Sequence, residues 1–106
     1  MDQKISFVVR LPGKPEARDE LYSSLINVLD EMSQEPDFVN TTLHRAVDDP
    51  DTLVVYETWE GTAEHFLEHH MKKQYRVDYE RKLETLLKSA RTFEWLDPIR
   101  SYVKGN

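Results

Sequence analysis

The clearest strand pattern in this sequence is residues 53–59, Leu53-Val54-Val55-Tyr56-Glu57-Thr58-Trp59, where β-branched and aromatic residues fill most positions. Bulky side chains occur on both faces of this segment, which predicts a central strand of a sheet. Turn-forming residues flank it, with Asp48-Asp49-Pro50-Asp51 before it and Gly61-Thr62 after it. The two turns separate the strand from the periodic segments on either side.

Upstream of this strand the hydrophobic period changes twice. Apolar residues alternate from Ile5 to Leu11, which predicts a strand that Pro12-Gly13-Lys14-Pro15 ends. Residues 16–34 then carry Leu, Val and Met at helical spacing, with acidic residues at the N-terminal end. Pro36 and Asp37 stop this helix, and residues 39–44 alternate again as a β-branched strand.

Downstream, the same analysis predicts helix and then strand. Gly61-Thr62 offers an N-cap to a helix that begins at Ala63, and the helical pattern continues to about Ala90 with a break near His70. Residues 92–96 alternate as a last strand. The order β-α-β-β-α-β predicts an α+β, ferredoxin-like fold, a split βαβ arrangement with a four-stranded antiparallel sheet and both helices on one face.

The chain length and the uncovered sheet face lead to two further expectations. We expect a single domain over residues 1–106, with a core at about 4–98 and a C-terminal tail at 99–106. The sheet face opposite the helices carries apolar groups that need cover, and this predicts a homodimer that packs sheet against sheet as a dimeric α+β barrel. The residues expected on that face are Val8, Thr42, Tyr56 and, on the last strand, Trp95 or its neighbours.

Composition restricts the class of partner. The net charge is −6 and no long run of Lys or Arg occurs, which argues against nucleic acid or an anionic membrane as a partner. The absence of cysteine excludes disulfides, a thiol nucleophile and a thiolate metal site. No apolar run approaches the roughly 20 residues that span a bilayer. The first residues lack the apolar segment of a signal peptide, so a cytoplasmic location is expected.

The spacing of the histidines bears on metal binding, and the pattern of charged residues bears on which helix face is exposed to solvent. His65 and His69 are four residues apart and could share a helix face, but two histidines with only a neighbouring glutamate to add are a weak metal signal, and no metal site is predicted. The charged residues from Lys72 to Lys88, Arg76 included, are typical of a solvated helix face. All four histidines lie within one hairpin and the helix after it: His44, His65, His69 and His70.

These residues resemble the antibiotic biosynthesis monooxygenase domain family over almost the whole chain. The resemblance covers a dimeric ferredoxin-like α+β barrel, and it is more specific for this fold than for a reaction, because similar domains include isomerases and haem degraders. The motifs that carry it are Phe7-Val8-Val9-Arg10-Leu11 before Lys14-Pro15, Glu35-Pro36, Leu43-His44-Arg45 with Asp49-Pro50, Tyr56-Glu57-x-Trp59, and His65 spaced five before His70-Met71.

The resemblance implies oxygenation without metal, flavin or haem, so no cofactor is expected. In this chemistry a small phenol, hydroquinone or catechol provides the electrons for dioxygen, and these two molecules are the expected partners. The substrate reacts far more readily as its anion, so a general base is required. His is the natural candidate, since its unperturbed pKa of about 6.5 lets it accept a proton near neutral pH.

The resemblance also implies roles for particular residues. His65 is expected first, as base or as hydrogen-bond donor to the substrate oxygen, in a cavity beneath the strand; the alternative is a partly exposed histidine at a helix start. Trp59 is expected either as a cavity wall that stacks on an aromatic substrate or as a core residue. Glu57 could orient a histidine or anchor the sheet. The residues expected to contact the substrate are Val55, Glu57, His70, Tyr79 and His44. The alternatives are that His70 caps or packs and that His44 lies at the dimer sheet face.

Two comparisons with the family's patterns narrow the substrate. The positions that match the sites of antibiotic-forming members hold Val55, Trp59, His65 and Tyr79, and only the tryptophan is retained. This argues against a polycyclic substrate, although His65 with Tyr79 could bind a smaller phenol. The positions that haem-degrading relatives use hold Val9, Glu68 and Asp78, which argues against haem degradation.

Three functions remain open from the sequence. An oxygenase of small hydroquinones or catechols leads. A non-oxidative enzyme, such as an isomerase of a small carbonyl compound, would be favoured by several polar groups in the cavity and no slot for a planar ring. A binding dimer without catalysis would be favoured by a cavity that Phe66, Met71 and Tyr79 fill.

Overall fold

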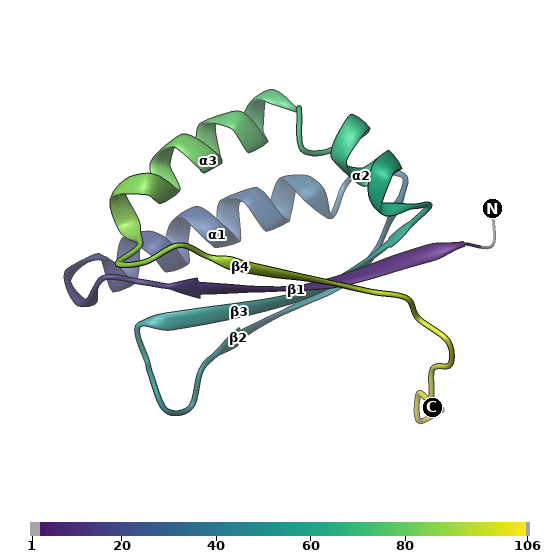
Figure 1. The fold of residues 1–106 in the computed structure, drawn as a ribbon, viewed down its shortest axis with the longest axis horizontal. Coiled ribbons are helices and arrows are strands. Elements are labelled where there is room, and N and C mark those ends of the chain that lie inside the picture. The colour runs from purple at the N-terminus through teal and green to yellow at the C-terminus, as the bar shows by residue number, and fades with distance from the viewer. Residues whose placement is uncertain (1–2, 106) are drawn as a thin grey trace.

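The computed structural model describes residues 3–105 and has one sheet and one layer of helices (Figure 1). Its element order agrees with the predicted β-α-β-β-α-β order once the second helix is divided in two. The elements are β1 (Lys4–Pro12), the 3-10 turn η1 (Pro15–Ala17), α1 (Arg18–Met32), β2 (Phe38–Arg45), β3 (Thr52–Glu60), α2 (Ala63–His69), α3 (Gln74–Leu86) and β4 (Thr92–Leu96).

The sheet confirms the predicted ferredoxin-like fold. Its strand order is β2-β3-β1-β4, and each neighbouring pair is antiparallel. In the centre of the sheet, Phe7 of β1 is paired with Glu57 of β3 on one side and with Trp95 of β4 on the other. All three helices lie on one face of the sheet, as Figure 1 shows. The strand predicted at residues 53–59 is β3, which has a neighbouring strand on each side and is therefore a central strand, as expected.

The core lies between this sheet face and the helices. The inward residues of β1 and β3 alternate, as the period of a strand requires, and α1 places its apolar residues three and four apart on the facing side. Burial of these side chains is the main stabilising contribution to the fold. The largest fully buried side chains are Trp59, Phe7, Phe66, Leu11, Leu21, Met32 and Val55.

The second half of the helical region divides near His70, as predicted. Thr62 caps α2, because its Oγ1 accepts a hydrogen bond from the His65 backbone N–H at 3.0 Å. α2 ends at His69 and α3 begins at Gln74. The expectation that the helix continues to about Ala90 is wrong, because Leu87 is extended and forms an isolated bridge with Gly13.

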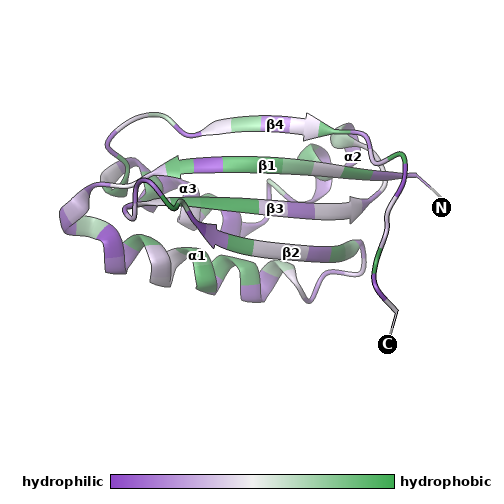
Figure 2. Ribbon diagram, turned by 90° about the horizontal axis from the view of Figure 1, so that it is seen from below, coloured by the Kyte–Doolittle hydropathy of each residue, from purple (hydrophilic) through white to green (hydrophobic). Residues whose placement is uncertain are grey.

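Within residues 3–105, no helix covers the other sheet face (Figure 2). Val8, Thr42 and Tyr56 lie on it, paired across β1, β2 and β3. Of the two alternatives expected on the last strand, Trp95 or its neighbours, Trp95 is excluded, because it packs against Phe7 on the helix side, with ring centroids 5.1 Å apart. Its neighbours in β4 take the open face instead, since side chains alternate along a strand.

The tail beyond β4 forms no helix or strand over residues 97–105. Figure 1 shows it leaving the sheet on the side away from the helices. Three apolar side chains there are exposed, namely Ile99, Tyr102 and Val103. Within residues 3–105, none of the helices has the length and apolar character needed to cross a membrane.

Candidate active site

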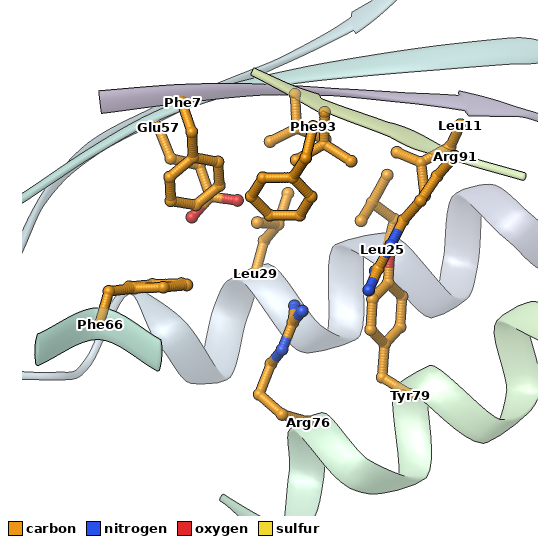
Figure 3. A pocket seen from close by; sticks show the side chains of 12 residues that line it. Phe7, Leu11, Leu25, Leu29, Glu57, Phe66, Arg76, Tyr79, Arg91 and Phe93 are labelled. Atoms are coloured by element: carbon orange, nitrogen blue, oxygen red, sulfur yellow. The ribbon is translucent and has the colours of Figure 1, made fainter. Parts of the chain in front are cut away.

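A small internal cavity lies between the sheet and the helices α1 and α3 (Figure 3). Its free volume is about 20 Å³, which is room for roughly one water molecule. Most of its wall is apolar, and its polar groups come from β3, α3 and the segment that leads into β4. The lining residues are Phe7, Val9, Leu11, Leu25, Leu29, Val55, Glu57, Phe66, Arg76, Tyr79, Arg91 and Phe93.

Glu57 is the carboxyl group of this cavity. It occupies an inward position of β3 and is only 4% exposed. Its Oε1 accepts a hydrogen bond from the indole Nε1–H of Trp59 at 2.9 Å. Burial raises the pKa of Glu57 because the ionised form loses its hydration, while the Trp59 hydrogen bond and the positive charge of Arg76 act in the opposite direction. The cavity thus contains an acid that releases its proton less readily than an ordinary glutamate.

Arg76 brings a positive charge to the same cavity. It is 6% exposed, and Figure 3 shows it reaching from α3 toward the sheet. Its Nη2 donates to Glu80 Oε2 at 2.7 Å and its Nη1 to the Met32 sulfur at 3.6 Å. Its Nε–H is buried and has no partner among residues 3–105. Desolvation lowers the pKa of Arg76, although the neighbouring Glu80 opposes this.

Arg91 and Tyr79 complete the polar lining. Arg91 forms two hydrogen bonds with the Glu80 carboxylate, at 2.6 and 2.8 Å, so Glu80 joins the two guanidinium groups. Tyr79 is buried beneath Arg76, whose guanidinium carbon lies 5.1 Å from the centre of the ring. Burial raises the pKa of Tyr79, which keeps its hydroxyl neutral.

The sequence did not single out Arg76 and Arg91. The expectation that Arg76 belongs to a solvated helix face is wrong, because its side chain points inward. A signal was present: Arg76, Tyr79, Leu83 and Leu86 are the buried residues of α3 and follow one helical stripe. No local pattern marks Arg91, since its position depends on how the segment after α3 returns to the sheet.

The predicted site residues fall into two groups. Val55, Glu57 and Tyr79 line the cavity. The other four, Trp59, His44, His65 and His70, do not belong to its lining. The structure therefore brings the glutamate and the tyrosine together but leaves every histidine outside.

Trp59 lies beside the cavity in the core. Of the two roles expected for it, cavity wall or core residue, the structure supports the core residue, because Trp59 is absent from the cavity lining, is 0% exposed and is surrounded by other rings. The ring centroids of Phe38, Phe66 and His70 lie 5.4, 5.0 and 4.6 Å from that of Trp59. Its contact with the site is indirect, through the hydrogen bond to Glu57.

His65 does not reach the cavity, so that expectation is also wrong. The adjacent Phe66 takes the inward position of α2 and is 1% exposed, whereas the His65 side chain is 40% exposed. His65 Nε2 lies 2.8 Å from Oδ2 of Asp37, a residue that precedes β2. His70 is buried, and its Nε2 contacts the same oxygen at 2.9 Å. We refer to Asp37, His65 and His70 as the surface histidine cluster.

The pKa of the carboxyl group is lowered in this cluster, whereas it is raised in the cavity. The hydrogen bonds from His65 and then His70 hold the pKa of Asp37 below its usual value. His69 stacks on His65, with ring centroids 4.3 Å apart, and is exposed. His44 is on the open sheet face, where its Nδ1 lies 3.3 Å from the Val54 carbonyl oxygen.

Together the fold and the cavity define a small ferredoxin-like α+β domain with a partly buried aromatic and polar site. The family model described as antibiotic biosynthesis monooxygenase matches residues 5–89. The chain belongs to the antibiotic biosynthesis monooxygenase family. No curated protein sequence matches it.

Solved structures of similar fold cover nearly all of the chain. Rv0793 from Mycobacterium tuberculosis has a TM-score of 0.84 at 19% identity and covers 94% of this chain and 99% of its own. PA3566 from Pseudomonas aeruginosa has a TM-score of 0.83 at 18% identity, with coverages of 94% and 98%. A crystal structure described as an antibiotic biosynthesis monooxygenase has a TM-score of 0.81 at 19% identity, with coverages of 91% and 99%. At these identities the likeness shows the fold alone.

Proposed function

We propose that this protein is a cofactor-independent monooxygenase that oxidises a small phenol, hydroquinone or catechol with dioxygen in the cavity between the sheet and α1 and α3. One observation carries the proposal: a buried carboxyl group, Glu57, and a buried guanidinium, Arg76, line the same aromatic cavity. The family to which the chain belongs also supports it.

The cavity residues divide the chemistry between them. Glu57 accepts the proton of the substrate hydroxyl, and its raised pKa makes it a stronger base than an ordinary carboxylate. Arg76 stabilises the resulting phenolate, and its unpartnered Nε–H can donate to the phenolate oxygen. We assign the base to Glu57 in place of His65 because only Glu57 lines the cavity.

The substrate anion then reacts with dioxygen. It transfers one electron to dioxygen, and the radical pair recombines at a ring carbon in the water-poor cavity. One oxygen atom stays on the ring and the other leaves as water. The substrate supplies all the electrons: a hydroquinone and dioxygen give a hydroxyquinone and water.

Binding of a ring requires the cavity to enlarge. Its free volume is about 20 Å³, whereas a cavity of about 150 Å³ is known to hold benzene. Phe93 and Arg91 are only half-buried and lie at the edge of the sheet, while Phe7 and Phe66 are fully buried. Displacement of the Phe93 ring is therefore the route by which a substrate enters.

Oxygen consumption tests this proposal. Purified, chelator-treated protein is measured against a panel of hydroquinones, catechols and naphthols, alongside Glu57→Gln, His65→Ala and a control in η1, Glu16→Gln, which changes an exposed glutamate. We expect consumption well above buffer in the wild type, in His65→Ala and in Glu16→Gln, and its loss in Glu57→Gln. Consumption at the buffer level across the panel, or full activity in Glu57→Gln, would reject the proposal.

The small volume favours a second candidate, a non-oxidative enzyme that acts on a small carbonyl compound. Glu57, Arg76, Tyr79 and Arg91 give the cavity four polar groups and no preformed slot for a ring. The same base would remove a proton next to a carbonyl group. Exchange of that carbon-bound hydrogen for deuterium in heavy water, lost in Glu57→Gln, distinguishes this reaction from oxygenation. Its absence, together with no oxygen consumption, would leave a binding dimer without catalysis.

We also propose that the open sheet face forms a homodimer. Val8 and Tyr56 lie next to each other on it, and Tyr56 remains 37% exposed. Burial of the apolar groups of this face against its own copy is favourable. Sedimentation should give a dimer for the wild type and for Tyr22→Lys on α1, and a monomer for Tyr56→Lys. A monomeric wild type would contradict the proposal.

A further inference from the structure

The surface histidine cluster lies outside the cavity and has no role in the proposed reaction. Its nitrogen and oxygen atoms converge from segments far apart in the sequence: Asp37 precedes β2, His65 lies in the first turn of α2 and His70 follows α2. One ligand atom from each residue lies within 4.8 Å of the other two. Both His Nε2 atoms lie within hydrogen-bond distance of a single oxygen, Asp37 Oδ2.

We propose that Asp37, His65 and His70 bind a divalent transition metal, with Zn²⁺ as the preferred ion and Co²⁺ or Ni²⁺ as substitutes. Two imidazole nitrogens and one carboxylate oxygen form a ligand set that suits these ions, whereas Mg²⁺ and Ca²⁺ prefer oxygen ligands. Three protein ligands leave the fourth coordination position to water.

The ligand atoms have to shift for a metal to bind. With metal bonds of about 2.0–2.1 Å, the ligand atoms of a tetrahedral site lie roughly 3.3–3.4 Å apart. The two N···O distances are 2.8 and 2.9 Å and have to lengthen, while the two nitrogens, which lie within 4.8 Å of one another, have to reach the same spacing. A bound metal would take the place of the hydrogen atoms that lie between Asp37 Oδ2 and the Nε2 atoms of His65 and His70.

The residues around the cluster hold two of the three ligands in place. His65 follows the Thr62 cap, and the preceding Gly61 has a φ of 100°, a left-handed conformation that suits glycine. His70 is packed against Trp59, with ring centroids 4.6 Å apart. Preorganised ligands bind a metal with less loss of side-chain entropy.

Neighbouring groups also hold the third ligand, Asp37, and surround the fourth coordination position. The Asp37 carbonyl oxygen accepts a hydrogen bond from the Glu60 backbone N–H at 2.8 Å, which ties Asp37 to the end of β3. Asp37, Glu60, Gly61, Thr62 and His65 line a surface hollow of about 350 Å³. Glu60 Oε1 is buried and has no partner within the described part of the chain, so it can accept a hydrogen bond from a metal-bound water.

One feature limits the affinity of the proposed site for a metal ion. Metal-bound histidines usually donate their second N–H to an acceptor, and loss of such a partner weakens binding by about 10–100-fold. His70 Nδ1 is buried and has no partner over residues 3–105. We therefore expect weaker binding than in a site whose histidines have such partners.

Zinc titration of the metal-free full chain by calorimetry tests the proposal, with Co²⁺ absorption as a second readout. The variants are Asp37→Asn and His65→Ala, and the matched controls are His69→Ala and His44→Ala, which change the other two histidines. His65→Ala and Asp37→Asn alter half-exposed side chains, so these variants should fold as the wild type does.

We expect one Zn²⁺ per chain, tetrahedral Co²⁺ bands, and affinity reduced at least tenfold in Asp37→Asn and His65→Ala but unchanged in the two controls. Three results would overturn the proposal: no saturable binding in the wild type, equal affinity in Asp37→Asn, or a loss in His69→Ala as large as that in His65→Ala. The last result would assign the metal to the pair His65 and His69.

Discussion

The cavity and the surface histidine cluster place carboxyl groups in opposite environments. Glu57 is almost fully buried and receives one hydrogen bond, from an indole, so its pKa rises. Asp37 keeps 35% of its side chain exposed and receives two hydrogen bonds from imidazole rings, so its pKa falls. Glu57 is therefore suited to holding a proton, and Asp37 is suited to pairing with a positive charge.

Two aromatic residues connect the two regions. Trp59 donates its indole N–H to Glu57 and packs its ring against His70. Phe66 lines the cavity, and its ring centroid lies 5.6 Å from that of His70. Changes at Trp59 should therefore affect both regions.

Trp59→Ala should have the largest effect on stability. Truncation of a buried tryptophan to alanine typically costs about 3–5 kcal/mol, because the lost contacts leave a cavity. Urea unfolding measures this loss, with Tyr22→Ala on the exposed side of α1 as the control, expected within about 0.5 kcal/mol of the wild type. A loss below about 1 kcal/mol for Trp59→Ala would show that the two regions are not packed through this ring.

Glu57→Gln should change how stability depends on pH. The folded-state pKa of Glu57 lies above its ordinary value of 4.5, so its contribution is fully present below about pH 4.5 and is lost as pH rises through the folded pKa. The loss is about 1.4 kcal/mol for each unit by which the pKa is raised. Glutamine stays neutral and keeps an acceptor for Trp59.

Urea unfolding between pH 4 and pH 8 measures this dependence. The stability of Glu57→Gln should fall less than that of the wild type over this range, and the control Glu16→Gln, at an exposed position of η1, should follow the wild type. Parallel curves for the wild type and Glu57→Gln would mean that the carboxyl group is not desolvated.

Asp37→Asn should have a smaller effect with the opposite pH dependence. The folded pKa of Asp37 lies below its ordinary value of 3.8, so its contribution is present above that pH and is lost as pH falls through the folded pKa. Because solvent screens the half-exposed cluster, we expect less than about 1 kcal/mol at pH 7. Unfolding curves should show the variant and the wild type converging in acid, and a difference that grows in acid would contradict the assignment.

His69→Ala should have the smallest effect. His69 is exposed and contacts the cluster only by stacking on His65. Surface substitutions of this kind usually change stability by less than about 0.5 kcal/mol. Thermal unfolding checks this, and a larger loss would extend the cluster to His69.

Most of the fold could be predicted from the sequence because hydrophobic period determines which side of an element is buried. The strand at 53–59, the Thr62 cap and the break near His70 all follow from local patterns. Trp95 could not be placed, because a five-residue strand between polar segments gives too short an alternation to distinguish its faces.

The site was less predictable because its parts are distant in sequence. Asp37 lies 28 residues before His65, and only the position of the loop before β2 beside α2 brings them together. Arg76 was assigned to solvent because charged residues rarely occupy a buried helical stripe. Glu57 could be placed on the same strand face as Val55 and Trp59, because alternate residues of a strand share one face.

The position of Trp59 also gives the molecule an optical reporter. Indole fluorescence depends on the groups that contact the ring, and the centroid of the His70 ring lies 4.6 Å from that of Trp59. The chain has two tryptophans, so Trp95→Phe would leave Trp59 as the only indole. The brightness of that one buried ring would then report changes at the surface histidine cluster, such as the binding of a metal ion.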